Sequence, residues 1–189
     1  MELEVLWREA VHGSATAWER LYQALGPRLY QFFLRNTRNV DVAMDKTQEV
    51  FEKLFQHRAD FDHGKLKTWA FRIARNLLID WWRKKSRLEI PTEVLPEIPD
   101  REDDLGSSVV ERLARDELIR LVDACLEELS EDDRLVLGLV YLGGLSLPEL
   151  AEAMEIPLGT AKTRARQARL RLDARMGLRS ALKEVATTT

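Results

Sequence analysis

The chain has 189 residues, 45 % of them hydrophobic, which suffices for one large domain or two small ones with a packed core. Charged residues interrupt every apolar stretch before it reaches the roughly 18 residues of a membrane-spanning helix, and the acidic start at residues 1–4 lacks the layout of a secretory signal. Membrane insertion is therefore not expected. The single cysteine, Cys125, cannot form an internal disulfide, which fits a cytoplasmic location.

The net charge of −3 conceals an uneven distribution along the chain. Residues 63–87 carry eight cations and one acid, a net charge of +7, and residues 159–176 carry six cations and one acid, a net charge of +5. Between them, residues 88–117 carry ten acids and three arginines, a net charge of −7. Two basic segments separated by an acidic one indicate contact with a polyanion at two places.

The N-terminal part of the chain predicts helices and no alternating strand. In the first long helix, apolar residues recur at three- or four-residue spacing from Trp18 to Phe32, and Gly26-Pro27 predicts a break or kink. The second helix is expected to start at Asp41, as its N-cap, and to end near Gln56. Its inner face is expected to consist of Val42, Ala43, Val50 and Leu54.

A third long helix is predicted after a loop at residues 62–64. Its spacing predicts four inward-facing side chains: Trp69, Ile73, Leu77 and Trp81. Burial is the preferred interpretation of the two tryptophans, ahead of a role as stacking platforms.

The segment 88–108 differs in character, because three prolines block helix and acids dominate, so it is expected to be an extended or flexible linker. Helical periodicity resumes near Val109. The sequence therefore predicts an all-α protein with two small helical domains, 1–87 and 109–178, joined by the acidic linker and followed by a tail at 179–189.

The second domain contains the sharpest local signal. Ser130 is expected to cap a helix that Gly143-Gly144 ends. Ser146 as N-cap and Glu149 three residues later form a capping box for the next, short helix. Its apolar stripe is Leu147, Leu150, Ala151 and Met154.

A further helix is predicted to open at Gly159-Thr160, after a turn at residues 155–157. Its buried face is expected to consist of Leu158, Ala161, Ala165, Ala168 and Leu172. Its outer face carries cations, hydroxyls and an amide: Thr160, Lys162, Thr163, Arg164, Arg166 and Gln167. A helix with small residues on its buried face and basic residues on its outer face suits entry into a DNA major groove. This helix and the short helix before it are therefore interpreted as a helix-turn-helix. The competing interpretation is a solvated basic face on an ordinary helical hairpin.

Several stretches carry a family resemblance. Residues 45–51 (DKTQEVF), 67–76 (KTWAFRIARN) and 77–87 (LLIDWWRKKSR) closely resemble the first conserved domain of bacterial sigma factors. Residues 129–164 resemble the promoter-reading C-terminal domain of the same family. The two domains joined by a short linker are similar to the compact extracytoplasmic-function group. The resemblance implies an initiation subunit of RNA polymerase without catalytic residues, cofactor or metal.

The resemblance also implies sites in the first domain. The core-polymerase surface, which docks on the coiled coil of the β′ clamp, corresponds to Asp45, Gln48, Glu49 and Glu52. The surface for the minus-ten promoter element corresponds to Lys65, Lys67, Arg72, Asn76, Asp80, Arg83, Lys84 and Arg87. A loop at residues 59–65 corresponds to the place where the family captures a flipped base.

In the second domain, the outer face of the helix-turn-helix corresponds to the surface for the minus-thirty-five element. The implied partners are promoter DNA, core polymerase through its β′ clamp and β flap, and an anti-sigma factor. The sequence departs from the family pattern at Met44, where an acid is usual, and at Gln167, where an arginine is frequent. The second departure concerns a position that faces DNA in the family.

Two other functions compete with this interpretation. A regulator that binds DNA through residues 146–176 without polymerase is the serious alternative, and it predicts specific binding by the protein alone. A metal hydrolase is disfavoured: His57, Asp60, Asp62 and His63 lie close in sequence, but no further firm ligand accompanies them.

Overall fold

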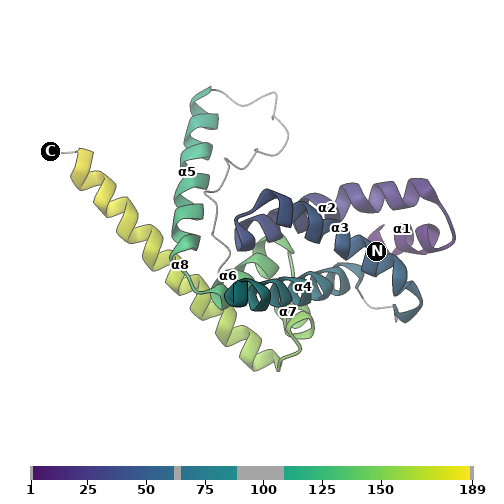
Figure 1. Cartoon of the computed structure of the whole chain (residues 1–189). Coiled ribbons are helices and arrows are strands. Elements are labelled where there is room, and N and C mark those ends of the chain that lie inside the picture. The colour runs from purple at the N-terminus through teal and green to yellow at the C-terminus, as the bar shows by residue number, and fades with distance from the viewer. Residues whose placement is uncertain (1, 62–64, 89–108, 188–189) are drawn as a thin grey trace.

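The computed structural model describes residues 2–61, 65–88 and 109–187, and within these ranges the chain is all-α, without a strand, as predicted (Figure 1). The predicted loop at 62–64 and nearly all of the predicted linker lie outside the described residues. The helices before the linker form the N-terminal unit: α1 (Glu2–Val11), α2 (Ala15–Thr37), α3 (Val40–Gln56), the 3-10 turn η1 (Arg58–Asp60) and α4 (Leu66–Leu88).

The N-cap of α3 is a different residue from the one predicted. Asn39 has an extended backbone, with φ −141°, and its side chain accepts the backbone N–H of Val42 at 2.9 Å. Asn39 is therefore the N-cap, and Asp41 lies exposed in the first turn, where its charge complements the helix dipole. Both residue types are good caps, and only the backbone path distinguishes them.

Pro27 lies inside α2, which continues from Ala15 to Thr37, so of the predicted break or kink at this position the break is wrong. A proline within a helix costs about 3 kcal/mol because it removes a hydrogen bond. Leu25 and Leu29, on either side of it, are both completely buried. Their burial stabilises the helix on both sides of the proline against the rest of the N-terminal unit.

The buried stripe of α4 is rotated relative to the prediction. Its fully buried apolar residues are Leu66, Ala70, Phe71, Ala74 and Leu78, and Thr68 is buried beside them. Of the predicted set, Leu77 is buried, whereas Trp69, Ile73 and Trp81 lie half-buried at the edge of the core. The cause is tertiary: α4 packs on α2 and α3 and also on α7 of the second unit, so its covered surface is wider than one stripe.

The helices after the linker form the C-terminal unit: α5 (Val109–Glu127), α6 (Glu131–Leu137), the π-helical turn η2 (Gly138–Leu142), α7 (Leu147–Met154) and α8 (Leu158–Thr187). Ser130 caps α6 as predicted, because its hydroxyl accepts the N–H of Asp133 at 3.2 Å. Helix α5 begins at Val109, also as predicted, and α8 continues through most of the segment that was expected to be a tail.

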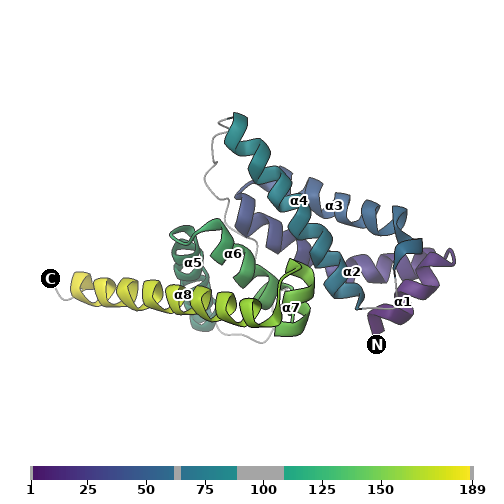
Figure 2. The same cartoon turned by 90° about the horizontal axis from the view of Figure 1, so that it is seen from below.

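The two units are in contact. Seen from below, α1–α4 lie to one side and α5–α8 to the other, with α7 next to α4 (Figure 2). Helix α7 packs on α4 as well as on α8, and the π turn packs on α2. Buried apolar side chains form one cluster that extends through both units, from Leu6 to Ala168.

We expect Asn39→Ala to lower the free energy of unfolding by about 1 kcal/mol, because the N–H of Val42 loses its acceptor. Asp41→Ala is the matched control and should cost only a few tenths of a kcal/mol, the value of a dipole interaction in an exposed first turn. Urea unfolding followed by circular dichroism measures both. Equal costs for the two substitutions would contradict the assignment of the cap.

Candidate nucleic-acid interface

The helix-turn-helix begins with the predicted capping box. The backbone N–H of Ser146 donates to Oε2 of Glu149 at 2.7 Å, and its hydroxyl donates to the same oxygen at 2.6 Å. At the other end of α7, Glu155 adopts the left-handed conformation with φ 56°. This residue turns the chain into α8, which begins at Leu158, one residue before the predicted start.

Helix α8 separates its two faces largely as predicted. Ala161 and Ala168 are completely buried, and all six residues of the predicted outer face are exposed. The prediction that Leu158 is buried is wrong, because this side chain remains 41 % exposed at the start of α8. Leu147, the first residue of the apolar stripe of α7, is 37 % exposed. The alanine stripe lets α8 lie close to its neighbours and present its polar side outward.

Part of the positive charge on α8 has a structural use that sequence reasoning missed. Arg171 binds both carboxylate oxygens of Asp133 on α6, at 2.7 and 2.8 Å, and Arg175 binds Glu128 at 2.7 Å. Arg169 pairs with Asp173 along the helix, at 3.6 Å. The cations of the predicted outer face, Lys162, Arg164 and Arg166, have no ion pair with another described residue. The acids before and within the first turn of α6 are visible in the sequence, but nothing there pairs them with particular arginines of α8.

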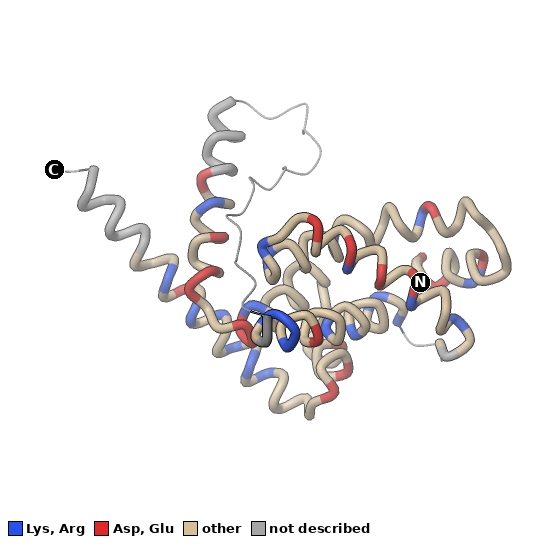
Figure 3. The backbone as a smooth tube through the Cα atoms, in the orientation of Figure 1, with Lys and Arg blue, Asp and Glu red and all other residues tan. Residues whose placement is uncertain are grey.

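The predicted minus-ten residues lie on α4 and immediately before it, a segment in which Lys and Arg positions recur along the backbone (Figure 3). Asn76, Asp80, Arg83 and Lys84 are exposed, and Arg72 is half-buried. Arg83 lies 3.5 Å from Asp80, one turn away, so these two side chains act as a pair. Arg87 belongs to the last turn of α4, but its side chain lies outside the described part.

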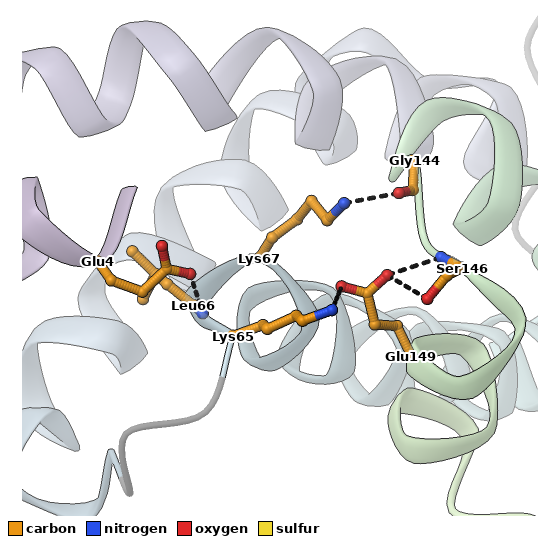
Figure 4. Close-up of polar contacts among 7 residues, drawn as sticks. All are labelled: Glu4, Lys65, Leu66, Lys67, Gly144, Ser146 and Glu149. Atoms are coloured by element: carbon orange, nitrogen blue, oxygen red, sulfur yellow. Dashed lines mark hydrogen bonds and ion pairs between the residues drawn. The ribbon is translucent and has the colours of Figure 1, made fainter. Parts of the chain in front are cut away.

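The N-terminal end of α4 contacts the helix-turn-helix, although the side chain of Lys65 remains 66 % exposed (Figure 4). Lys65 Nζ lies 3.1 Å from Oε1 of Glu149, and Lys67 Nζ donates to the carbonyl oxygen of Gly144 at 2.6 Å. Burial raises the pKa of Glu149, but hydrogen bonds from Ser146 and the ammonium of Lys65 outweigh it and lower the pKa to about 2. The carboxylate is therefore ionised at neutral pH.

The predicted core-polymerase residues lie on the outer side of α3. Asp45, Gln48 and Glu52 are exposed and Glu49 is half-buried. Gln48 donates to Glu52 at 2.8 Å, and Glu49 pairs with two lysines of the same helix, Lys46 and Lys53. The departure at Met44 places an apolar side chain, 60 % exposed, beside these acids.

The remaining candidates carry no site within the described ranges. Residues 2–61, 65–88 and 109–187 contain no group of three metal-ligating side chains, although residues 62 and 63 of the metal hypothesis fall outside them. Cys125 is completely buried, as expected for a structural thiol. None of the described helices is long and apolar enough to cross a membrane.

Comparison with known proteins gives matches to both units. Residues 21–88 match Sigma-70 region 2, and residues 119–172 match Sigma-70, region 4. The ECF RNA polymerase sigma factor SigM of Bacillus subtilis is 31 % identical over 157 residues, which cover 82 % of this chain and 93 % of SigM. The ECF RNA polymerase sigma factor RpoE of Cereibacter sphaeroides is 33 % identical over 167 residues, 87 % of this chain and 89 % of the relative.

Two solved structures share the fold. CnrH in complex with the cytosolic domain of CnrY superposes with a TM-score of 0.65 and 25 % identity, covering 90 % of this chain and 94 % of that one. The sigma factor RpoE in complex with the anti-sigma factor NepR from Bartonella quintana has the same TM-score at 24 % identity, covering 85 % of this chain and 96 % of that one.

The chain consists of two helical units, and the second contains a helix-turn-helix with an exposed cationic face. Together with the matches to both Sigma-70 regions, this architecture defines a sigma-70 type transcription factor. The chain belongs to the extracytoplasmic-function (ECF) group of the sigma-70 family.

Glu149→Gln should lower the free energy of unfolding at pH 7 by about 1–3 kcal/mol, because Gln preserves the capping box but not the ionised contacts. The carboxyl pKa is lowered in the folded chain, so its contribution is complete above pH 4.5 and declines as the pH falls toward 2. Urea titrations between pH 7 and 3 should show the two proteins converging below pH 4.5. Glu152→Gln, exposed on the same helix, is the control. A difference independent of pH would contradict the prediction.

Proposed function

We propose that this sigma factor binds core RNA polymerase in the cytoplasm through α3 and brings it to promoters, which it contacts through α4 and α8. The observation that carries the proposal is the presence of exposed cations on one helix of each unit, α4 and α8, together with exposed acids on α3. Each of these sets of charges is complementary to a partner of opposite charge. The chain needs no catalytic residue for this role, because polymerase performs the chemistry.

The minus-thirty-five element is the proposed ligand of α8. The exposed residues are Thr160, Lys162, Thr163, Arg164, Arg166 and Gln167. Arginine and lysine in a major groove bind phosphates or guanine edges, and glutamine binds adenine. Because Gln167 replaces an arginine that is frequent in the family, it is proposed to shift the preferred base at its position.

The minus-ten element is the proposed ligand of α4 and the loop before it. Separated strands need cations for their phosphates, which Lys65, Lys67, Arg72, Arg83, Lys84 and Arg87 supply. Asn76 and Asp80, both exposed and one turn apart, are the proposed base contacts. A flipped base would enter the loop at residues 59–65, of which 62–64 lie outside the described residues.

Protein partners are proposed for α3 and for the C-terminal unit. The β′ clamp is the proposed partner of Asp45, Gln48, Glu49 and Glu52, and the β flap is that of the C-terminal unit. An anti-sigma factor is proposed as regulator, supported by a fold neighbour that was solved with one. The acidic linker is proposed to pass near the RNA exit path as a mimic of nucleic acid.

The alternative is a regulator that acts without polymerase. The match to Sigma-70 region 2 disfavours it, because such a regulator does not require that region. Run-off transcription with purified core polymerase on a library of promoter fragments separates the two. New start sites that require this protein support the sigma role. Absence of new transcripts together with tight specific DNA binding by the protein alone would establish the alternative.

Arg164→Ala should reduce run-off from a responsive promoter by about 5- to 150-fold, the effect of losing one base or phosphate contact of 1–3 kcal/mol. Arg169→Ala is the matched control, because it removes the same charge from the same helix but from a side chain that is paired with Asp173. Comparable losses in both variants would show that net charge matters and that α8 does not read the promoter.

Asp45→Ala should weaken binding of fluorescently labelled protein to core polymerase by about 5-fold or more, as expected for a charged interface contact. Glu19→Ala on α2 removes an exposed acid outside the proposed surface and should leave this affinity unchanged. Fluorescence anisotropy without DNA measures the affinity directly. Equal affinity of both variants would exclude Asp45 from the interface.

A further inference from the structure

A cavity of about 220 Å³ lies where α2 meets α5, α6, the π turn and α8. Much of its wall is apolar, and five side chains from the C-terminal unit form this part: Val122, Leu126, Leu137, Leu142 and Leu172. Polar side chains come from α2 and α6, namely Arg35, Asn36 and Arg134, and the exposed Tyr141 completes the lining from the π turn. A mostly apolar cavity with a few polar groups has the composition of a small-molecule site.

Three polar atoms of the lining are buried without a well-directed hydrogen bond to a described residue. They are Nε of Arg35, Oδ1 of Asn36 and Nε of Arg134. Asn36 is only 6 % exposed, and its Nδ2 donates to the carbonyl oxygen of Phe32 at 2.7 Å. Because a carbonyl oxygen only accepts, this bond fixes the orientation of the amide and leaves Oδ1 unpaired. The lining residues therefore offer two N–H donors and one acceptor to a ligand, and leaving these atoms unpaired is unfavourable.

The cation on α6 has no ionic partner among the described residues. Nη1 of Arg134 donates to the carbonyl oxygen of Leu126 at 3.4 Å, which leaves the positive charge unneutralised. Burial lowers the pKa of the Arg134 guanidinium, and the acid that opposes this shift, Glu131, is exposed to solvent. Arg35, in contrast, pairs with Asp123 at 2.8 Å. One charge at the cavity remains to be neutralised, which favours a ligand with a single negative charge.

The size and the lining of the cavity favour an organic ligand over water. At roughly 30 Å³ per molecule, 220 Å³ corresponds to about seven waters, and a buried water typically makes about three hydrogen bonds. The three unpaired polar atoms and the leucine-rich wall supply few of these bonds. An apolar cavity of about 150 Å³ binds benzene, so this cavity has room for one ring with short substituents.

We propose that this cavity is a binding site for a small aromatic acid that carries a hydroxyl group. The carboxylate accepts from Nε of Arg134 and neutralises its charge, and Nε of Arg35 is a further donor. The ring occupies the apolar part of the cavity, and the hydroxyl group donates to Oδ1 of Asn36. None of the residues proposed to contact DNA or polymerase lines the cavity, so the inference does not rest on those contacts.

Isothermal titration calorimetry of the full chain with three related compounds tests the chemistry of the site. We expect 4-hydroxyphenylacetate to bind with a dissociation constant below about 1 mM. Phenylacetate lacks the hydroxyl group and should bind about 3-fold more weakly, the effect of one neutral hydrogen bond. The compound 2-(4-hydroxyphenyl)ethanol lacks the carboxylate and should bind at least about 10-fold more weakly, because it leaves the charge of Arg134 unneutralised.

Two variants locate the binding at this cavity. Arg134→Gln removes the unneutralised cation and should weaken binding of 4-hydroxyphenylacetate at least about 10-fold. Val122→Phe keeps all three polar side chains but fills part of the cavity with a ring, and it should weaken binding to a similar extent. Arg20→Gln removes an exposed cation of α2 outside the cavity and is the matched control. Circular dichroism establishes that each variant retains its helices.

Each outcome decides for or against the site. Binding of 4-hydroxyphenylacetate that either folded cavity variant weakens and Arg20→Gln leaves unchanged supports it. No binding at millimolar concentrations, equal binding by the wild-type chain and the cavity variants, or equal affinity for 2-(4-hydroxyphenyl)ethanol overturns it. Run-off transcription without any added acid tests the proposed function separately, so that failure of the site leaves the sigma role intact.

Discussion

A single buried carboxylate connects the local fold of the helix-turn-helix with the contact between the two units. Glu149 is only 7 % exposed, holds the start of α7 through Ser146, and binds Lys65 from the other unit. Since α7 packs on both α4 and α8, the position of its first turn determines how the two proposed DNA-binding helices are related. The charge is tolerated in this place because hydrogen bonds keep the carboxyl group ionised.

Features that depend on neighbouring residues were predicted well from the sequence. The cap at Ser130, the capping box and the alanine stripe of α8 each require residues within one or two turns of one another. One local prediction was wrong, the cap at Asp41, because Asn39 two residues earlier is an equally good cap. The other errors arose where distant packing decides. Trp69 and Trp81 have the spacing of a core face, yet α4 is covered from two sides and turns smaller residues inward.

The sequence alone could not show which basic residues form ion pairs within the protein and which remain exposed. Arg171 and Arg175 raise the net charge of the basic segment, but they fasten α8 to residues 38 and 47 positions away in the chain. Lys65 and Lys67 likewise contact the second unit across a long stretch of sequence. A segment charge therefore overestimates the cations that are available to DNA, and only the folded chain separates structural cations from exposed ones such as Arg164.

The two proposed DNA-binding helices belong to different units, and this arrangement limits what each can do alone. Helix α7 packs on both α4 and α8, so the units are in contact. Asp45, Gln48 and Glu52 on α3 are exposed in the same arrangement, so the proposed polymerase surface is accessible. Lys65 and Lys67 contact the second unit, although the side chain of Lys65 remains 66 % exposed. If α4 and α8 bind the two promoter elements as proposed, each contact gains strength when both units are held on one scaffold.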